Sequence, residues 1–339
     1  MKKTVLTIIQ ILVTLGILFW IFHDPAKRHE MLQAISHADP AWLLIGIASY
    51  GMVEILATAR WQVLLRVQGI RIPWMRLGSL FMIGIFFNQF MPGGTGGDVV
   101  KIFYLLKETP GKKAQALLAV LIDRVVGLFG LILLTSVIIW KKYDWLQQTE
   151  ITRHLTWTLL AILAASLGGI IFSFAISGLG LIHKLPKKMP LRDKLIDLSI
   201  AYNLYARAWQ SSLLAIILSL GIHLSSFFMF YSAAMSLRAK VSLPDFFSVM
   251  PIINTISSIP ISVGGTGVRE GLFQTLLGKL CGIPEANAVV ISLTGFAMVL
   301  FWAVVGGVIY LFYRPTEHAK LSDIQHEVEE LEHKVAESE

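Results

Sequence analysis

The chain has 339 residues, of which 55% are hydrophobic and only 15% are charged, and its mean hydropathy is +0.67. Soluble domains carry about 25% charged residues, so this chain lacks the side chains that a water-facing surface requires and belongs in a bilayer. Its net charge of +7 does not indicate nucleic-acid binding, because the basic residues gather at the ends of apolar segments, where membrane topology accounts for them. The single cysteine, Cys281, excludes an internal disulfide.

Six apolar segments are long enough to cross a membrane, which takes about 20 residues in a helix. They are 4–22, 41–59, 117–140, 155–178, 211–235 and 288–312. The first follows two lysines, as the core of a signal peptide does, but it is long for such a core and no small-residue cleavage site follows it. We therefore interpret it as a retained helix and predict an all-α, polytopic membrane protein with six full spans.

Lysine and arginine residues orient these segments, because links rich in them stay on the cytoplasmic side. The N-terminus, the link after the second span and the link 181–208 are rich in them and are predicted to be cytoplasmic. The links 23–40, 141–154 and 236–245 carry weaker or mixed charge and are predicted to lie outside. Both termini are then cytoplasmic, and we expect a multi-pass protein of the bacterial inner membrane.

Two shorter apolar segments, 77–91 and 246–263, each run into a glycine-rich turn, and the first glycines of the two turns, at 93 and 264, are 171 positions apart. Basic residues stand both before and after the first segment, so 77–101 is predicted to be a re-entrant hairpin that enters from the cytoplasm. The same reasoning from basic residues and crossings predicts that 246–271 is a hairpin that enters from the opposite side. Irregular backbone at membrane depth is tolerated only inside protein or along a wet cavity.

The repeat extends beyond the turns. A shift of 171 or 172 residues lays 41–59 on 212–230 and 114–117 on 286–289. Each half then has three crossings and one hairpin, and because three is odd, the second half is inverted relative to the first. Two inverted repeats with broken helices at their centre are typical of transporters, whose substrate site lies between the repeats.

These segments make one predicted membrane domain, residues 1–313, with repeats at about 4–140 and 155–313. The segment 314–339 differs, because its apolar residues recur at spacings of three and four among glutamate, histidine and lysine. This pattern predicts a short amphipathic helix on the cytoplasmic side. A solvated helix is the simpler interpretation, and a helix that binds a partner protein is the alternative.

The glycine turns have a use at membrane depth. Successive N–H groups without side chains can point into one concavity and hold an anion, and a helix that begins just after the turn adds its positive end. The alternative is that the glycines only permit a tight hairpin and close packing. Two pseudo-symmetric copies flanked by charge favour a site, and the predicted substrate-binding residues are Asn88, Gly93, Gly94, Gly96, Gly97, Asp98, Lys101, Asp123, Arg124, Gly264, Gly265, Gly267, Arg269 and Glu270.

A charge inside the membrane is costly and is a functional candidate by default, but each one here also has a structural interpretation. Asp98 would cap a helix. Asp123 and Arg124 would form a pair near the membrane interface. Glu54, inside the second span, would be protonated or paired with arginine near the cytoplasmic end. Arg60, which follows that span, could reach a lipid phosphate, but we interpret it as an anchor on the cytoplasmic side.

Two further polar residues lie in apolar runs. Asn88 either lines the cavity or satisfies the freed backbone of a broken helix. His223 lies deep in a span and is interpreted as a packed core residue, with a proton relay as the alternative. The sequence contains no zinc-protease motif, no nucleotide-binding loop of the lysine type and no paired cysteines, so we expect neither catalysis nor a metal or cofactor.

Several of these residues together resemble a known family. Asn88, Pro92, Gly97, Asp98, Lys101, Asp123, Arg124 and Gly127, with the later run from Gly264 to Gly271, are similar to the flippase-like membrane region of lysylphosphatidylglycerol synthases. The resemblance covers about residues 4–313. It implies two inverted repeats with re-entrant helices and movement of a phospholipid between leaflets. The synthases also carry a cytoplasmic aminoacyl-transferase domain, for which the segment after Phe312 is too short, so we expect another lipid as substrate.

The leading hypothesis is therefore a flippase-like transporter of an anionic phospholipid or a lipid-linked substrate. The alternatives are a factor for lipid-linked glycosyl or aminoacyl transfer, and a membrane scaffold that acts through its tail. The expected partners are membrane phospholipids or a lipid-linked substrate and not nucleic acid, with a protein at the C-terminal tail as a further option. The oligomeric state is not indicated.

Overall fold

A computed structural model of the chain describes residues 25–90, 96–109, 112–178, 204–259 and 265–313. All regular structure within these ranges is helical, which confirms the predicted all-α class. Some sequence predictions fall outside the described residues. They are the span 4–22, the tail 314–339, and the turn glycines Gly93, Gly94 and Gly264.

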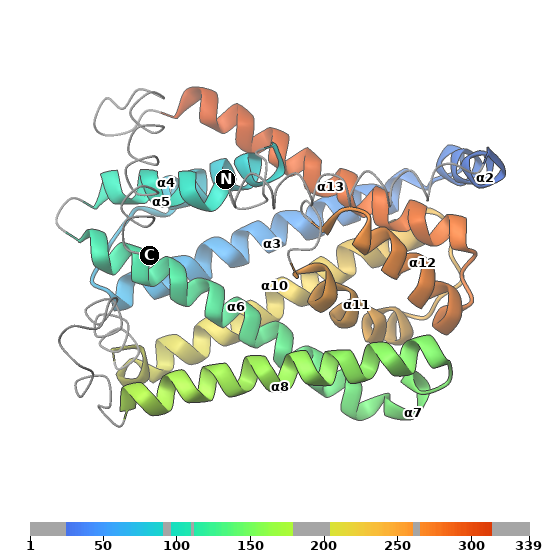
Figure 1. Cartoon of the computed structure of the whole chain (residues 1–339). Coiled ribbons are helices and arrows are strands. Elements are labelled where there is room, and N and C mark those ends of the chain that lie inside the picture. Colours follow the sequence, from blue (N-terminus) through green and yellow to red (C-terminus); the bar gives the residue numbers. More distant parts are fainter. Residues whose placement is uncertain (1–24, 91–95, 110–111, 179–203, 260–264, 314–339) are drawn as a thin grey trace, which may run out of the picture.

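In the described part of the chain, five helices of 28 or 29 residues form the body of the molecule (Figure 1). They are α3 (Pro40–Val67), α6 (Lys113–Lys141), α8 (Glu150–Gly178), α10 (Trp209–Ser236) and α13 (Glu285–Phe312). At about 1.5 Å per residue each is roughly 42 Å long, which exceeds the roughly 30 Å hydrocarbon core of a bilayer.

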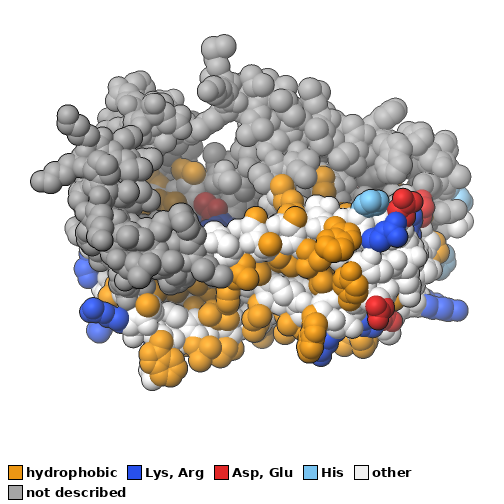
Figure 2. All heavy atoms as spheres, turned by 60° about the horizontal axis from the view of Figure 1, so that its bottom comes forward, with side chains coloured by type: hydrophobic (Ala, Val, Ile, Leu, Met, Phe, Trp, Pro, Cys, Tyr) orange, Lys and Arg blue, Asp and Glu red, His pale blue; other side chains and the backbone are white. Residues whose placement is uncertain are grey.

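The four helices α3, α6, α10 and α13 are also apolar enough to be membrane spans. They contain four of the six predicted spanning segments, which confirms a polytopic membrane protein. The predicted span 155–178 lies within the long helix α8. Figure 2 shows the surface that such a protein presents to lipid, because hydrophobic side chains spread across the middle of this face and most charged ones lie toward its two ends.

Four shorter helices form two pairs. Helix α4 (Trp74–Phe90) packs on α5 (Gly96–Glu108), and α11 (Leu243–Ser257) packs on α12 (Val268–Cys281). With 13 to 17 residues, each is about 20–26 Å long and too short to cross the hydrocarbon core. Figure 1 shows the α4–α5 pair at one end of the long helices and the α11–α12 pair at the other end, where α2 (Pro25–Ser36) and α7 (Tyr143–Leu146) also lie.

Local sequence signals explain where several of these helices begin and end. Asp39 caps α3 by accepting a hydrogen bond from the backbone N–H of Ala41 at 2.9 Å, and a proline follows at the first helical position. Ser242 caps α11 in the same way through the N–H of Asp245. The Ser242 hydroxyl in turn donates to the carboxylate of Asp245 and lowers the pKa of that group. Helix α12 ends at Gly282, whose φ of +68° is left-handed.

Each short pair has its own hydrophobic core. One cluster joins α3, α4, α5 and α6 and includes the buried residues Trp61, Leu77 and Phe103. The other joins α6, α8, α10, α11, α12 and α13 and includes Phe227 and Phe273. Helices α3 and α10 pack extensively on each other between these clusters. The two ends of the molecule are thus held by separate apolar cores around a common pair of long helices.

Close packing between α4 and α13 requires glycine. A Cβ atom on Gly306 would lie 2.1 Å from the carbonyl oxygen of Met82, and one on Gly307 would lie 2.8 Å from the ring of Phe86. Because side chains at these positions would collide with α4, the glycines allow the α4–α5 pair to lie directly against a spanning helix.

Candidate functional site

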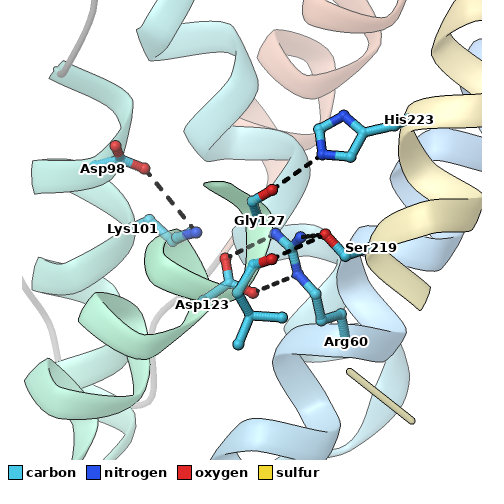
Figure 3. Close-up of polar contacts among 8 residues, drawn as sticks. Arg60, Asp98, Lys101, Asp123, Gly127, Ser219 and His223 are labelled. Carbon is cyan, nitrogen blue, oxygen red and sulfur yellow. Dashed lines mark hydrogen bonds and ion pairs between the residues drawn. The ribbon is translucent and has the colours of Figure 1, made fainter. Parts of the chain in front are cut away.

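Arg60 forms the centre of a buried polar cluster (Figure 3). It is only 8% exposed, because α3 continues for seven residues beyond it to Val67. Its Nε donates to Asp123 Oδ1 at 2.8 Å, its Nη2 donates to Asp123 Oδ2 at 3.2 Å, and its Nη1 donates to Ser219 Oγ at 3.0 Å. The interpretation of Arg60 as a cytoplasmic anchor was therefore wrong. The side chain instead ties α3 to α6 and α10.

Two backbone carbonyls of α6 complete this arrangement. Ser219 Oγ donates to the oxygen of Val126 at 3.2 Å, and His223 Nε2 donates to the oxygen of Gly127 at 3.0 Å (Figure 3). A Cβ on Gly127 would lie 3.2 Å from Arg60 Nη1, so the glycine leaves room for the guanidinium. His223 also stacks on Phe227, which agrees with its interpretation as a packed residue.

Asp98, Lys101 and Arg124 form the second part of the cluster. Asp98 lies in the first turn of α5 and makes an ion pair with Arg124, while Lys101 Nζ lies 4.0 Å from the same carboxylate. The Lys101 ammonium also lies 4.6 Å from the ring centroid of Trp61 and 4.8 Å from that of Phe81. Such cation–π contacts stabilise an ammonium that is otherwise shielded from water.

The predicted pairing of Asp123 with Arg124 was wrong. Adjacent residues of a helix point about 100° apart because a turn takes 3.6 residues, so the two side chains reach different neighbours. Asp123 binds Arg60, and Arg124 binds Asp98. The Arg124 side chain is 57% exposed, whereas that of Asp123 is buried. We call this set the first cluster; it consists of Arg60, Asp98, Lys101, Asp123, Arg124 and Ser219.

Asn88 and Gly97 fasten the start of α5 to the end of α4. The N–H of Gly97 donates to Asn88 Oδ1 at 3.0 Å. A Cβ on Gly97 would lie 1.7 Å from the carbonyl oxygen of Gly84, so the two helices touch through their backbones. Of the two interpretations of Asn88, the geometry favours the one in which its side chain accepts a hydrogen bond from a backbone N–H that the helix break leaves free. The N–H of Gly97 is engaged within the protein, and that of Gly96 lies at the first residue of the helix.

Glu270 organises a separate cluster at the start of α12. Its side chain is fully buried, and Oε2 accepts from the N–H of Gly267 at 2.6 Å. Its Oε1 accepts from Arg269 Nη2 at 2.7 Å, Arg269 Nε at 3.0 Å and Ser292 Oγ at 2.9 Å. The Arg269 guanidinium also lies 4.7 Å from the ring centroid of Phe296 on α13. We call this set the second cluster; it consists of Gly267, Arg269, Glu270 and Ser292.

The second glycine turn needs glycine for its backbone. Gly265 has φ of +75° and Gly267 has φ of +87°, a region that residues with a side chain rarely adopt. A Cβ on Gly265 would also lie 3.0 Å from the carbonyl oxygen of Ser257. Because the N–H of Gly267 binds Glu270, this part of the turn closes the helix end within the protein.

Glu54 lies near the middle of α3, where it shares a side-chain hydrogen bond with Tyr50 and interacts electrostatically with Lys101 of the first cluster. It is 6% exposed, with 14 residues of the helix before it and 13 after it. Its Oε2 is buried without a hydrogen-bond partner among the described residues. The expected position near the cytoplasmic end was therefore wrong, and no arginine pairs with Glu54 in the described part of the chain.

The structure thus brings Asp98, Lys101, Asp123 and Arg124 together, and it places Arg269 and Glu270 in a second group. Sequence reasoning missed Arg60, Ser219 and Ser292 as partners of these charges. Arg60 could have been found, because the apolar periodicity of its helix continues past it; single serines in apolar spans give no such signal. Within the part of the chain that the structure describes, no three His, Cys, Asp or Glu side chains gather as metal ligands.

Comparison with known proteins gives consistent matches along the chain. The model of the family described as "Lysylphosphatidylglycerol synthase TM region" matches residues 7–307. A UPF0104 membrane protein of Pyrococcus horikoshii is 23% identical over 342 residues, which cover 92% of this chain and 97% of that protein. A UPF0104 membrane protein of Methanothermobacter thermautotrophicus is 23% identical over 299 residues, which cover 80% of this chain and 86% of that protein.

Proposed function

The chain belongs to the lysylphosphatidylglycerol synthase transmembrane-region family, and from that premise we propose that it moves an anionic phospholipid or a lipid-linked substrate between the two leaflets of its membrane. The observation that carries this proposal is the first cluster, which lies among helices long enough to span a bilayer. Charges at such depth are costly, and they commonly mark the path of a substrate or ion.

Arg124 is the residue in the first cluster that is best placed to receive an anion. Arg60 uses three of its nitrogens on Asp123 and Ser219, whereas Arg124 pairs with Asp98 and keeps more than half of its side chain exposed. A phosphate group would replace Asp98 as the partner of Arg124, because the planar guanidinium suits two parallel hydrogen bonds to phosphate. The N-terminal end of α5 adds partial positive charge at the same place.

An apolar groove beside the first cluster suits the acyl chain of the same lipid. The groove has a volume of about 340 Å³, and it runs between α3, α6 and α10. Its lining is almost entirely apolar and includes Leu64, Ile122, Val126, Phe129 and Leu213. Ile122 and Val126 flank Asp123 along α6, so an acyl chain in the groove would lie next to the charges that receive the headgroup.

Two re-entrant hairpins and two inverted repeats are part of the proposal. The order of one long helix, two short helices and one long helix occurs twice, from α3 to α6 and from α10 to α13. The short helices are about 20–26 Å long, and their pairs lie at opposite ends of the long helices (Figure 1). Each pair would enter the membrane from its own side, and rocking of one repeat against the other would open the site to each leaflet in turn.

The proposed orientation follows the positive charge. The link between α3 and α4 and the start of α4 carry Arg71 and Arg76, which mark that end of the molecule as cytoplasmic. The α11–α12 pair then faces the outer side of the inner membrane. A non-enzymic role accompanies this proposal, with membrane phospholipid as the partner.

The test is lipid movement by the purified protein in liposomes of phosphatidylcholine. Labelled phosphatidylglycerol at trace level should equilibrate between leaflets much faster with the protein than in protein-free liposomes, and labelled phosphatidylcholine should move more slowly. Equal rates with and without the protein would contradict the proposal. Chemical conversion of the labelled lipid would instead favour a transfer enzyme.

A further inference from the structure

Three carboxylates in the described helices are buried, and one of them differs from the others. Asp123 accepts two hydrogen bonds from Arg60, and Glu270 accepts from Arg269, Ser292 and a backbone N–H. Glu54 is buried too and shares a side-chain hydrogen bond with Tyr50, but its Oε2 has no hydrogen-bond partner among the described residues. Because a buried carboxylate with one oxygen that no donor reaches is more costly than a neutral carboxyl, Glu54 is the one member of this set whose burial favours a bound proton.

The charged groups around Glu54 come from several helices. Lys101 on α5 interacts with it electrostatically, and Tyr50 on α3 itself shares a side-chain hydrogen bond with it. Helices α4, α6, α10 and α13 also pack against α3, and their titratable groups are engaged elsewhere or lie toward the helix ends. These groups are Arg76 on α4, Lys113, Asp123, Arg124 and Lys141 on α6, His223 and Tyr231 on α10, and Glu285 and Tyr310 on α13.

Lys101 links Glu54 to the first cluster. Its ammonium interacts with Glu54 and also lies 4.0 Å from Asp98, which binds Arg124. An anionic headgroup at Arg124 would draw on the same positive charge and would repel an ionised Glu54. A neighbouring negative charge favours the protonated form of a carboxyl. By linkage, a proton on Glu54 would strengthen anion binding to the same degree.

We propose that Glu54 is a proton-binding site and that one proton on it crosses the membrane with each singly charged anionic headgroup. This inference rests on the proposed lipid transport and adds its energy source. The negative headgroup and the proton together carry no net charge. The process is therefore driven by a pH difference and not by the membrane potential.

The experiment measures the equilibrium distribution of labelled phosphatidylglycerol between leaflets. The purified protein is reconstituted in phosphatidylcholine liposomes with a pH difference of one unit, and potassium with valinomycin holds the potential at zero. One proton per lipid predicts about tenfold accumulation in the leaflet that faces the alkaline compartment, because one pH unit corresponds to a factor of ten. A pH-sensitive dye in the lumen should report proton movement when phosphatidylglycerol is added to one leaflet only.

The variants assign the proton to one residue. Glu54→Gln should still move the lipid, but the distribution ratio should fall to about one and the dye signal should vanish, because the amide holds no exchangeable proton in this range. Glu54→Asp keeps a carboxyl and should keep coupling, which guards against loss of folding in the amide variant. Glu150→Gln, an exposed change of the same type on α8, should match the wild type.

Each result has one meaning. If the wild-type protein moves phosphatidylglycerol but the pH difference does not change its distribution between leaflets, proton coupling is overturned and the transport proposal stands. If Glu54→Gln keeps the tenfold ratio, Glu54 is not the site. If phosphatidylglycerol does not move at all with the wild-type protein, the proposed function fails and the coupling fails with it.

Discussion

Each of the two charged clusters includes residues in the first turns of a short helix, α5 or α12, but the clusters differ in how completely their charges are satisfied. In the first cluster, Asp98 faces two cations, and the Arg124 side chain is 57% exposed. In the second cluster, Glu270 is fully buried and binds Arg269, Ser292 and the backbone. The second cluster thus fastens the start of α12 to α13, while the proposed function requires the first cluster to exchange a protein carboxylate for a substrate anion.

Glu270→Ala should have the largest effect on stability. The change removes the partner of Arg269 and frees the N–H of Gly267, which leaves a buried charge without compensation. Breaking a buried ion pair from one side costs about 3–5 kcal/mol. Thermal unfolding of the purified protein in detergent should show this loss, together with reduced yield. A melting temperature equal to that of the wild type would contradict the conclusion that the hydrogen bonds within the second cluster stabilise the fold.

Gly97→Val should disrupt the packing of α5 on α4 by steric collision. A Cβ at this position would lie 1.7 Å from the carbonyl oxygen of Gly84, so α4 and α5 must separate. We expect loss of lipid transport at matched expression, because α5 carries Asp98 and Lys101. Gly271→Ala is the matched control, since a Cβ there meets no atom within 4 Å. Transport by Gly97→Val at the wild-type rate would show that the close approach of the two helices is dispensable.

Arg124→Ala should weaken binding and leave stability nearly unchanged. Hydrogen bonds to charged groups contribute about 1.5–3 kcal/mol, which corresponds to roughly 10- to 100-fold in affinity. Binding of phosphatidylglycerol in detergent micelles and thermal unfolding should be measured on the same preparations. Arg269→Ala provides the contrast, because its main loss should be in stability. The surface change Lys141→Ala should alter neither, and equal profiles for both arginine variants would remove the distinction between the clusters.

Asp98→Asn should have the smallest effect on stability. It should strengthen lipid binding, whereas Arg124→Ala should weaken it. Partly exposed ion pairs contribute about 0–1 kcal/mol, so the melting temperature should change little. Because the amide no longer competes as an anion for Arg124, the affinity for phosphatidylglycerol should rise. Titration of the labelled lipid against this variant and the wild type tests the exchange, and a lower affinity in the variant would count against it.

Part of this account follows from the sequence and part does not. Hydropathy alone predicts the spans in α3, α6, α10 and α13, because about 20 consecutive apolar residues satisfy a bilayer without help from tertiary contacts. The repeated glycine turns predict helices that begin just after them, at Asp98 and at Val268, and α5 and α12 begin at Gly96 and Val268. Sequence cannot predict which partner a buried charge finds. Arg60 lies 63 positions from Asp123 and 159 from Ser219, and only packing of α3 on α6 and α10 brings them together.

The glycine residues show the same limit. Their recurrence was interpreted as a pair of anion-binding turns, but the structure gives the N–H groups of Gly97 and Gly267 to Asn88 and Glu270. Composition does not tell whether an amide faces a cavity or its own helix end. That choice depends on neighbours that come from elsewhere in the chain, such as Gly84 against Gly97.

The most direct test of the central claim is leaflet exchange of labelled phosphatidylglycerol in liposomes that contain either wild-type protein or Arg124→Ala at equal amounts. We predict rapid exchange with the wild type and, following the expected loss of affinity, exchange about 10- to 100-fold slower with the variant when the lipid is limiting. Exchange by the wild type no faster than in protein-free liposomes, or equal exchange by both proteins, would contradict the account.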